Sequence, residues 1–125
     1  MKEVLTTNKA PSAIGPYSQG IKTNGLVFVS GQIPINPQTG LITGNDFESQ
    51  TKQSLENIKA VLESGGMTLD NVVKATVYIT DMSQFDTVNR AYAEYFKENA
   101  PARVAVEVSK LPKNALVEIE VIAAE

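Results

Sequence analysis

The sequence predicts an α+β protein in which two helices pack on one face of a mixed β-sheet. Runs of β-branched residues recur along the chain, and two segments with apolar residues at helical spacing lie between them. No linker or low-complexity tract divides the 125 residues. Strands interrupted by helices and followed by two further strands are typical of a helix layer lying on a sheet. We therefore expect one domain that spans residues 1–125.

The first third of the chain is expected to hold a loop, a strand and a second irregular segment. Residues 9–20 (KAPSAIGPYSQG) are rich in Pro, Gly and Ser, which favours an ordered loop. Residues 26–32 (LVFVSGQ) are β-branched and aromatic, and they predict a strand that ends near Gly31. The stretch GQIPINPQTGLITG contains two prolines and three glycines, which indicates a turn-rich excursion.

A helix is expected to follow this excursion, capped by Asn45. Asparagine is a favourable N-cap, and Glu48 lies three residues further on, as in a capping box. Gly65 and Gly66 are expected to end the helix. The residues that recur at helical spacing between these limits are Phe47, Thr51, Leu55, Ile58 and Leu62.

The rest of the chain predicts a strand, a second helix and two final strands. Residues 71–80 form a strand whose one face would carry Val73, Ala75, Val77 and Ile79. The second helix is expected to start near Ser83, with an apolar stripe of Phe85, Val88, Tyr92, Tyr95 and Phe96. Residues 102–109 and 115–123 predict the last two strands, joined by a turn at LPKN.

The sheet face that points away from the helices has a mixed composition. Its candidate positions combine Val and Leu with Thr, Glu and Lys. A half-apolar open face on a small domain is commonly covered by another subunit. We therefore expect a homo-oligomer.

The residue types that are absent limit the chemistry. The chain has no Cys and no His, which excludes thiol nucleophiles, disulfides and Ser-His-Asp triads and removes the commonest zinc ligands. The net charge of −3 gives no general attraction to nucleic acid. The N-terminal residues show no apolar signal region, and no run approaches the ~20 apolar residues of a membrane span. We expect a soluble, cytoplasmic protein with no membrane partner.

Arg103 is the first candidate for a functional group. It lies near the start of PARVAVEV, residues 101–108, whose β-branched residues favour burial, and an unpaired guanidinium is costly to bury. One interpretation is that the side chain reaches solvent or pairs with a nearby acid. The other is that its planar fork binds a small carboxylate ligand through two parallel hydrogen bonds.

Glu118 and Glu120 share one face of the last predicted strand. They are either a solvated pair that contacts neighbouring cations, or one of them is a base that positions water. If the last two strands formed a hairpin about LPKN, Arg103 would lie near Val121 and not opposite Glu118. A site that uses both groups would then require another topology or a second chain.

Four other residues are candidates with an equally simple structural explanation. Tyr17 follows Gly-Pro in a loop, where a tyrosine is more often a packing anchor than a ligand contact. Ser30 ends an apolar strand, and Gly31 would let a ligand approach backbone amides closely. Asn89 lies beside the apolar stripe of the second helix, where a surface role is expected. Together with Arg103 and Glu118, these residues predict only a small-anion binder, with metal-free hydrolysis as an option.

Six segments nevertheless occur in the order and spacing of one known family. They are AIGPYSQG, VSGQIP with NPQTG, QSLENIKAVLE, VVKATVYITDM with FDTVN, PARVAVEVSKLPK, and VEIEVIA. Together they closely resemble the RidA-type enamine/imine deaminases of the YjgF family, known as 2-iminobutanoate/2-iminopropanoate deaminases. The resemblance covers nearly the whole chain. It implies a chorismate-mutase-like fold, a homotrimer with active sites in clefts between subunits, and no metal or organic cofactor.

The resemblance also implies a reaction and a set of site residues. The reaction is hydrolysis of enamines and imines such as 2-aminoacrylate and 2-iminobutanoate to 2-oxo acids and ammonia. Arg103 corresponds to the family's carboxylate-binding arginine and Glu118 to its water-activating glutamate. The other substrate-binding positions are Tyr17, Ser30, Gly31, Asn89 and Ala105. Many members carry a cysteine where this chain has Ala105, so a thiol role at that position is excluded.

Two alternative functions remain open at this point. A non-catalytic sensor of small 2-oxo or imino acids would use the same arginine. An RNA-directed role is the other alternative, because family members have also been described as translation inhibitors or ribonucleases; the net charge and the lack of histidine argue against it. A pericyclic mutase would rest on analogy of fold alone.

Overall fold

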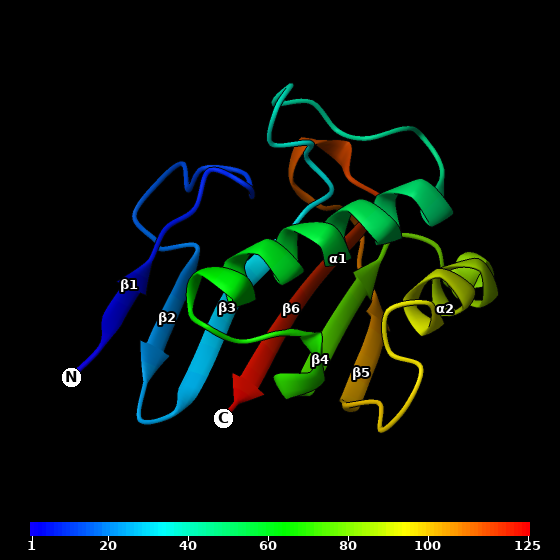
Figure 1. Ribbon diagram of the computed structural model, residues 1–125. Helices are drawn as coiled ribbons and strands as arrows, with labels where there is room; N and C mark the ends of the chain where they lie inside the picture. The colour runs from blue at the N-terminus through cyan, green and yellow to red at the C-terminus, as the bar shows by residue number, and fades with distance from the viewer.

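The computed structural model describes residues 1–125 and contains a six-stranded mixed sheet with both helices on one face (Figure 1). The elements are β1 (Glu3–Leu5), β2 (Gly20–Thr23), β3 (Leu26–Gln32), α1 (Phe47–Ser64), β4 (Val72–Ile79), α2 (Phe85–Ala93), β5 (Ala102–Glu107) and β6 (Val117–Ala124). The strand order is β1-β2-β3-β6-β4-β5, and β4 and β5 are parallel whereas the other neighbours are antiparallel. The predicted α+β architecture is therefore confirmed.

The hydrophobic core lies between α1 and the sheet. Along β6 buried residues alternate with half-buried ones, so Val117, Ile119 and Val121 face the helices while Glu118 and Glu120 face the other side. The main contributions from α1 are Leu55, Ile58, Val61 and Leu62, all without exposed surface. Each such side chain stabilises the fold by roughly 1.5–3 kcal/mol. Neither helix has the length and apolar character needed to cross a lipid bilayer.

The first helix begins one residue later than predicted. The N-cap is Asp46 and not Asn45, because the Asp46 carboxylate accepts a hydrogen bond from the backbone N–H of Ser49 at 2.8 Å. This bond lowers the pKa of the Asp46 carboxyl. The end of α1 agrees with the prediction, since Gly65 is the C-cap and Gly66 has a φ of 79°.

The second helix also begins later than predicted. Ser83 lies in a short 3-10 turn, η2 (Met82–Gln84), whose N-cap Asp81 accepts a hydrogen bond from the Ser83 backbone N–H at 3.0 Å. Helix α2 then starts at Phe85 and ends at Ala93, so Tyr95 and Phe96 lie beyond it. Both aromatic side chains still pack against the core from that position.

The face assigned to Val73 was wrong. The pairing of β4 with β6 shifts register between Val72 and Lys74, which is the signature of a β-bulge. As a result Val72 is buried, whereas Val73 is 49% exposed. The buried face of β4 consists of Val72, Ala75, Val77 and Ile79.

Strands β1 and β2 were not predicted, because each is only three or four residues long. Gly20 begins β2 at a close approach to α1, where an added Cβ would lie 2.7 Å from Cγ1 of Val61. The last two strands do not form a hairpin, since β4 lies between β5 and β6. A short 3-10 turn, η3 (Pro112–Asn114), lies on the connection between them.

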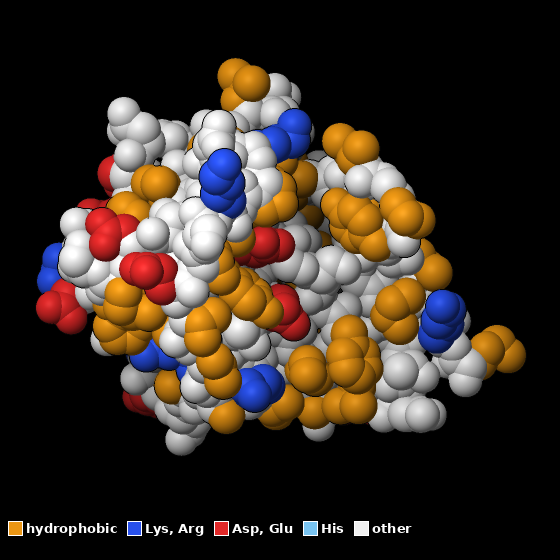
Figure 2. All heavy atoms as spheres, turned by 180° about the vertical axis from the view of Figure 1, so that it is seen from behind, with side chains coloured by type: hydrophobic (Ala, Val, Ile, Leu, Met, Phe, Trp, Pro, Cys, Tyr) orange, Lys and Arg blue, Asp and Glu red, His pale blue; other side chains and the backbone are white.

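The face of the sheet away from the helices carries exposed apolar side chains, among them Phe28, Val104 and Val106. Figure 2 shows this face, where hydrophobic side chains surround a hollow that contains acidic groups. The expectation that most of residues 101–108 are buried was wrong for the isolated chain, because β5 is an edge strand and most of its residues are exposed. Such an apolar edge and face agree with the expected covering by another subunit.

Candidate functional site

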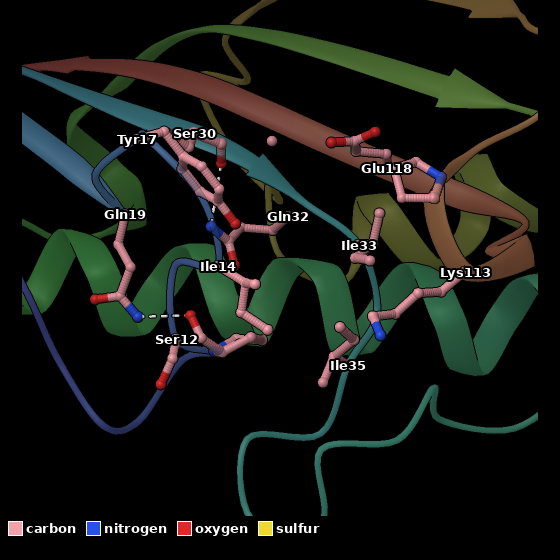
Figure 3. Close-up of a pocket in the computed structure, with 13 residues that line it drawn as sticks. Ser12, Ile14, Tyr17, Gln19, Ser30, Gln32, Ile33, Ile35, Lys113 and Glu118 are labelled. Atoms are coloured by element: carbon pink, nitrogen blue, oxygen red, sulfur yellow. Dashed lines mark hydrogen bonds between the residues drawn. The ribbon is translucent and has the colours of Figure 1, made fainter.

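A cavity of about 590 Å³ lies where β3 ends beside β6 (Figure 3). Its walls come from the loop before β2, from the end of β3 and the segment after it, from η3, and from β6. Four of the predicted site residues line it: Tyr17, Ser30, Gly31 and Glu118. The structure therefore brings together residues that are up to about a hundred positions apart in the sequence.

The close approach of Glu118 to Gly31 shapes the floor of this cavity. A Cβ added to Gly31 would clash with Oε2 of Glu118 and would lie 3.0 Å from its Cδ. Gly31 lies at the register shift between β3 and β6, where regular pairing is interrupted. The missing side chain at position 31 thus makes room for the Glu118 carboxylate over the end of β3.

The environment of Glu118 favours a proton acceptor. Burial raises the pKa of its carboxyl above the ordinary value of 4.5, and the nearby charge of Glu120 raises it further. No hydrogen bond from the rest of the chain reaches the Glu118 carboxylate, so its oxygens can accept from water or from a ligand. No group of three or more acidic side chains is arranged to hold a metal ion.

A hydrogen-bonded loop holds Tyr17 at the rim of the cavity. The side-chain amide of Gln19 donates to the carbonyl of Pro11 at 2.7 Å and to that of Thr7 at 3.0 Å. The Ser30 hydroxyl donates to the carbonyl of Ser18 at 2.6 Å, which ties the loop to β3. Ser30 therefore has a structural role in addition to any ligand contact, and the ring of Tyr17 stays exposed beside the opening.

Arg103, Asn89 and Ala105 form a second group outside this cavity. Nη1 of Arg103 donates to Oδ1 of Asn89 at 2.7 Å. Cζ of Arg103 lies 5.3 Å from the ring centroid of Phe85 and 4.8 Å from that of Tyr92. The guanidinium is thus held by one amide and two aromatic rings, although Arg103 is largely exposed in the isolated chain.

The residues that hold Arg103 come from one face of α2. Phe85, Asn89 and Tyr92 are spaced at i, i+4 and i+7, which places them along a single side of the helix. From the sequence, the two aromatic residues were expected only as part of an apolar stripe, without a contact to Arg103. Asn89 lies between the two aromatic residues at helical spacing, and this pattern is the sequence signal that indicates a polar contact on the stripe.

No carboxylate of the chain neutralises Arg103. The ion pairs of the structure join Lys52 of α1 to Glu48 of the same helix and to Glu94, which directly follows α2. The guanidinium is always charged, and it is fixed against aromatic rings while its remaining N–H groups are unpaired. It is therefore suited to binding a planar anion.

The two groups of candidate residues lie on opposite faces of the sheet. Arg103 pairs in register with Ala75, whose side chain is buried on the helix side. Glu118 pairs in register with Tyr78 on the open side. One chain therefore does not bring the predicted arginine and glutamate into a single site.

Comparison with known proteins places the chain among a group of relatives over almost its whole length. The model of the Endoribonuclease L-PSP family matches residues 7–125. A RutC family protein of Pyrococcus horikoshii is 58% identical over 123 residues, which are 98% of each chain. TdcF of Escherichia coli, whose name gives it as a candidate reactive intermediate deaminase, is 45% identical over 98% of this chain and 97% of its own.

Solved structures of relatives share the fold. The crystal structure of E. coli TdcF with bound serine has a TM-score of 0.95 and 44% identity, and the match covers 98% of both chains. The crystal structure of the E. coli YjgF gene product has a TM-score of 0.94 and 45% identity, again over 98% of both chains.

Proposed function

We propose that this chain, which belongs to the Endoribonuclease L-PSP (YjgF) family, hydrolyses reactive enamines and imines to 2-oxo acids and ammonia. The family itself, which six segments of the sequence predicted, is confirmed by the family model and by the relatives. The name of TdcF supports a deaminase reaction, and the serine bound to TdcF supports a small ligand that carries a carboxylate.

The surroundings of Arg103 support a ligand that carries a carboxylate. Arg103 is held in place by Asn89, Phe85 and Tyr92, yet no acidic side chain of the chain lies within ion-pair distance. A guanidinium arranged in this way is suited to a ligand carboxylate, and a 2-imino or 2-amino acid brings one next to its reactive C–N bond.

The active site is proposed to form between two chains of a homotrimer. Arg103 and Glu118 lie on opposite faces, so Arg103 of one chain would complete the cavity that contains Glu118 in the next. The apolar side chains of Phe28, Val104 and Val106 on the open face, and the exposed edge at β5, support contact between chains in this region.

The proposed reaction uses orientation and one base. Arg103 binds the substrate carboxylate, and the enamine becomes the imine by taking up a proton at carbon and releasing one from nitrogen. Glu118 orients a water molecule and accepts its proton as the oxygen forms a bond with the imine carbon. That proton passes to the nitrogen, which gives the carbinolamine. The hydroxyl proton of the carbinolamine then passes through Glu118 to the same nitrogen, the C–N bond breaks as the C=O bond forms, and ammonia leaves the 2-oxo acid. Because imines react readily with water, orientation and a base supply enough acceleration.

The remaining predicted residues would enclose a small substrate. In this proposal Tyr17 packs against the ligand, and Ser30 and Asn89 supply polar contacts. The backbone near Gly31 and Ala105 forms the rest of the pocket. Ala105 follows Arg103 by two positions on β5 and is half-buried, so its backbone would lie close to a carboxylate bound by the guanidinium.

The experiment that tests the proposal measures ammonia and 2-oxo acid formed from 2-aminoacrylate, generated in situ from serine by a pyridoxal-phosphate dehydratase. The wild-type chain is expected to accelerate ammonia release, whereas Glu118→Gln should bind a small carboxylate ligand without accelerating release. Binding with no acceleration by the wild-type chain would indicate a sensor. Salt-sensitive cleavage of RNA in its place would favour the activity for which the family is named.

A further inference from the structure

The open face of the sheet holds a second carboxylate that the proposed reaction does not use. Glu120 follows Glu118 by two residues on β6, so both side chains point to the same face, but only Glu118 lines the cavity. Tyr78 on β4 lies opposite Glu118 in register, and its hydroxyl donates to Oε2 of Glu120 at 2.7 Å. The phenol therefore reaches diagonally across the two strands to the carboxylate beside the proposed base.

We propose that Tyr78 and Glu120 act as a positioning pair, in which Tyr78 fixes the Glu120 carboxylate so that its negative charge controls how readily Glu118 accepts a proton. The inference rests on the proposed role of Glu118 as the base. It assigns no direct contact with substrate to Tyr78 or Glu120, since neither lines the cavity.

The electrostatics of the three groups agree with this geometry. Burial and then the charge of Glu120 raise the pKa of Glu118. The hydrogen bond to Glu120, together with burial, raises the pKa of Tyr78 to about 12, so the phenol remains a protonated donor throughout the neutral range. A carboxylate whose pKa is raised toward the working pH, but is still ionised there, is a more effective general base.

Glu120 is the only other acid near Glu118 on this face. On β3 the nearest residues are Ser30 and Gly31, and on β5 the side chains on the open side are apolar, as at Val104 and Val106. Tyr78 on β4 lies opposite Glu118, and the other titratable groups that line its cavity are Tyr17 in the loop before β2 and Lys113 in η3. Lys74 lies further along β4, where it pairs in register with Ile122. Neither lysine forms an ion pair with Glu118.

The direct test follows the Glu118 carboxyl carbon by NMR as the pH is changed, which requires no activity. Glu120→Gln is expected to move the Glu118 titration midpoint to lower pH, because the nearby negative charge is gone. Tyr78→Phe should move it in the same direction by less, because Glu120 is no longer fixed. In the double variant, the Glu118 midpoint should be the same as in Glu120→Gln alone. Both changes conserve side-chain size, and amide spectra show whether each variant keeps the native fold.

A matched control removes a similar charge elsewhere. Glu63 is an exposed residue of α1 on the other side of the sheet, and Glu63→Gln changes the net charge as Glu120→Gln does. It should leave the Glu118 midpoint unchanged. If Glu120→Gln leaves the midpoint unchanged as well, or if Tyr78→Phe has its full effect without Glu120, the pair does not act on Glu118 and the inference is wrong.

The pH dependence of kcat provides the link to the reaction. The acid limb of the Glu120→Gln profile should move to lower pH. At a pH below the midpoint of this limb, the fraction of the plateau kcat that the variant retains should be roughly threefold larger than the fraction that wild type retains. A shifted NMR midpoint in a chain that does not hydrolyse imines would refute the proposed function but support the pair. An unshifted midpoint in an active enzyme would refute the pair alone.

Discussion

Arg103 and Glu118 lie on opposite faces of the sheet, and strand β4 separates the strands that carry them. Arg103 faces the rings of Phe85 and Tyr92 on α2, whereas Glu118 faces a cavity beside Gly31. Each group is held in a defined environment, but neither has the other within reach in one chain. A reaction that needs both therefore requires two chains.

Replacing Arg103 by lysine tests the carboxylate-binding fork. Arg103→Lys keeps the positive charge but loses the planar pair of donors and the guanidinium that lies against the aromatic rings. We expect kcat/KM for ammonia release to fall roughly 100-fold, with an unchanged circular dichroism spectrum. Wild-type turnover in Arg103→Lys would show that a point charge is sufficient and that no fork is used.

Asn89→Ala tests whether the amide orients Arg103. Removing the acceptor 2.7 Å from Nη1 frees the guanidinium to turn on the aromatic rings. KM is expected to rise roughly tenfold, with a smaller change in kcat and little change in Tm, because Asn89 is exposed. Arg90→Ala serves as the control, because Arg90 is an exposed neighbour on α2 whose hydrogen bond goes to Thr87 and not to Arg103. Equal effects of the two variants on KM would contradict the orienting role.

Gly31→Ala tests the space that the Glu118 carboxylate occupies. The new Cβ would clash with the end of a flexible side chain, so Glu118 should move away at little loss of stability. We expect kcat to fall at least roughly tenfold while Tm changes little. In a Glu118→Ala background the same substitution should cause no further loss of activity. A large drop in Tm for Gly31→Ala would instead indicate that position 31 matters for folding.

The raised pKa of Glu118 predicts how stability depends on pH. The folded-state pKa lies above the ordinary value of 4.5, so the folded protein binds the proton more tightly than the unfolded chain does. Glu118 therefore destabilises the fold as the pH rises from the unfolded-state pKa through the folded-state pKa. This loss of folding free energy persists at higher pH. Glu118→Gln should raise Tm at about pH 7.5 and should lose this advantage at about pH 3.5. A difference in Tm that is the same at both pH values would contradict the assignment.

Much of the fold could be predicted from local sequence patterns. The strand at residues 26–32 and the helix that ends at Gly65 follow from β-branched runs, helical periodicity and glycine placement. Strands β1 and β2 could not be predicted, because three or four residues are too few to show alternation. The bulge at Val73 is set by pairing with β6, which no local pattern encodes.

The candidate site was predictable only as a list of residues. The resemblance of six segments to the family identified four candidate residues, Tyr17, Ser30, Gly31 and Glu118. The structure places all four around one cavity. The positions of β4 between β5 and β6, and of Arg103 on the helix side, depend on the tertiary strand order and could not follow from spacing. The aromatic contacts of Arg103 were missed because they depend on how β5 packs beside α2, which spacing along the chain does not reveal.

Mixing two inactive variants tests whether each active site is shared between neighbouring chains. Arg103→Ala removes the carboxylate-binding group and Glu118→Gln removes the base, so each variant alone should be inactive. If each site takes Arg103 from one chain and Glu118 from its neighbour, random reassembly of equal amounts restores about a quarter of the sites, because both intact groups must meet at one contact. We predict about a quarter of wild-type ammonia release from the mixed trimers. Activity that stays at the level of the separate variants after verified subunit exchange would contradict a site shared between chains.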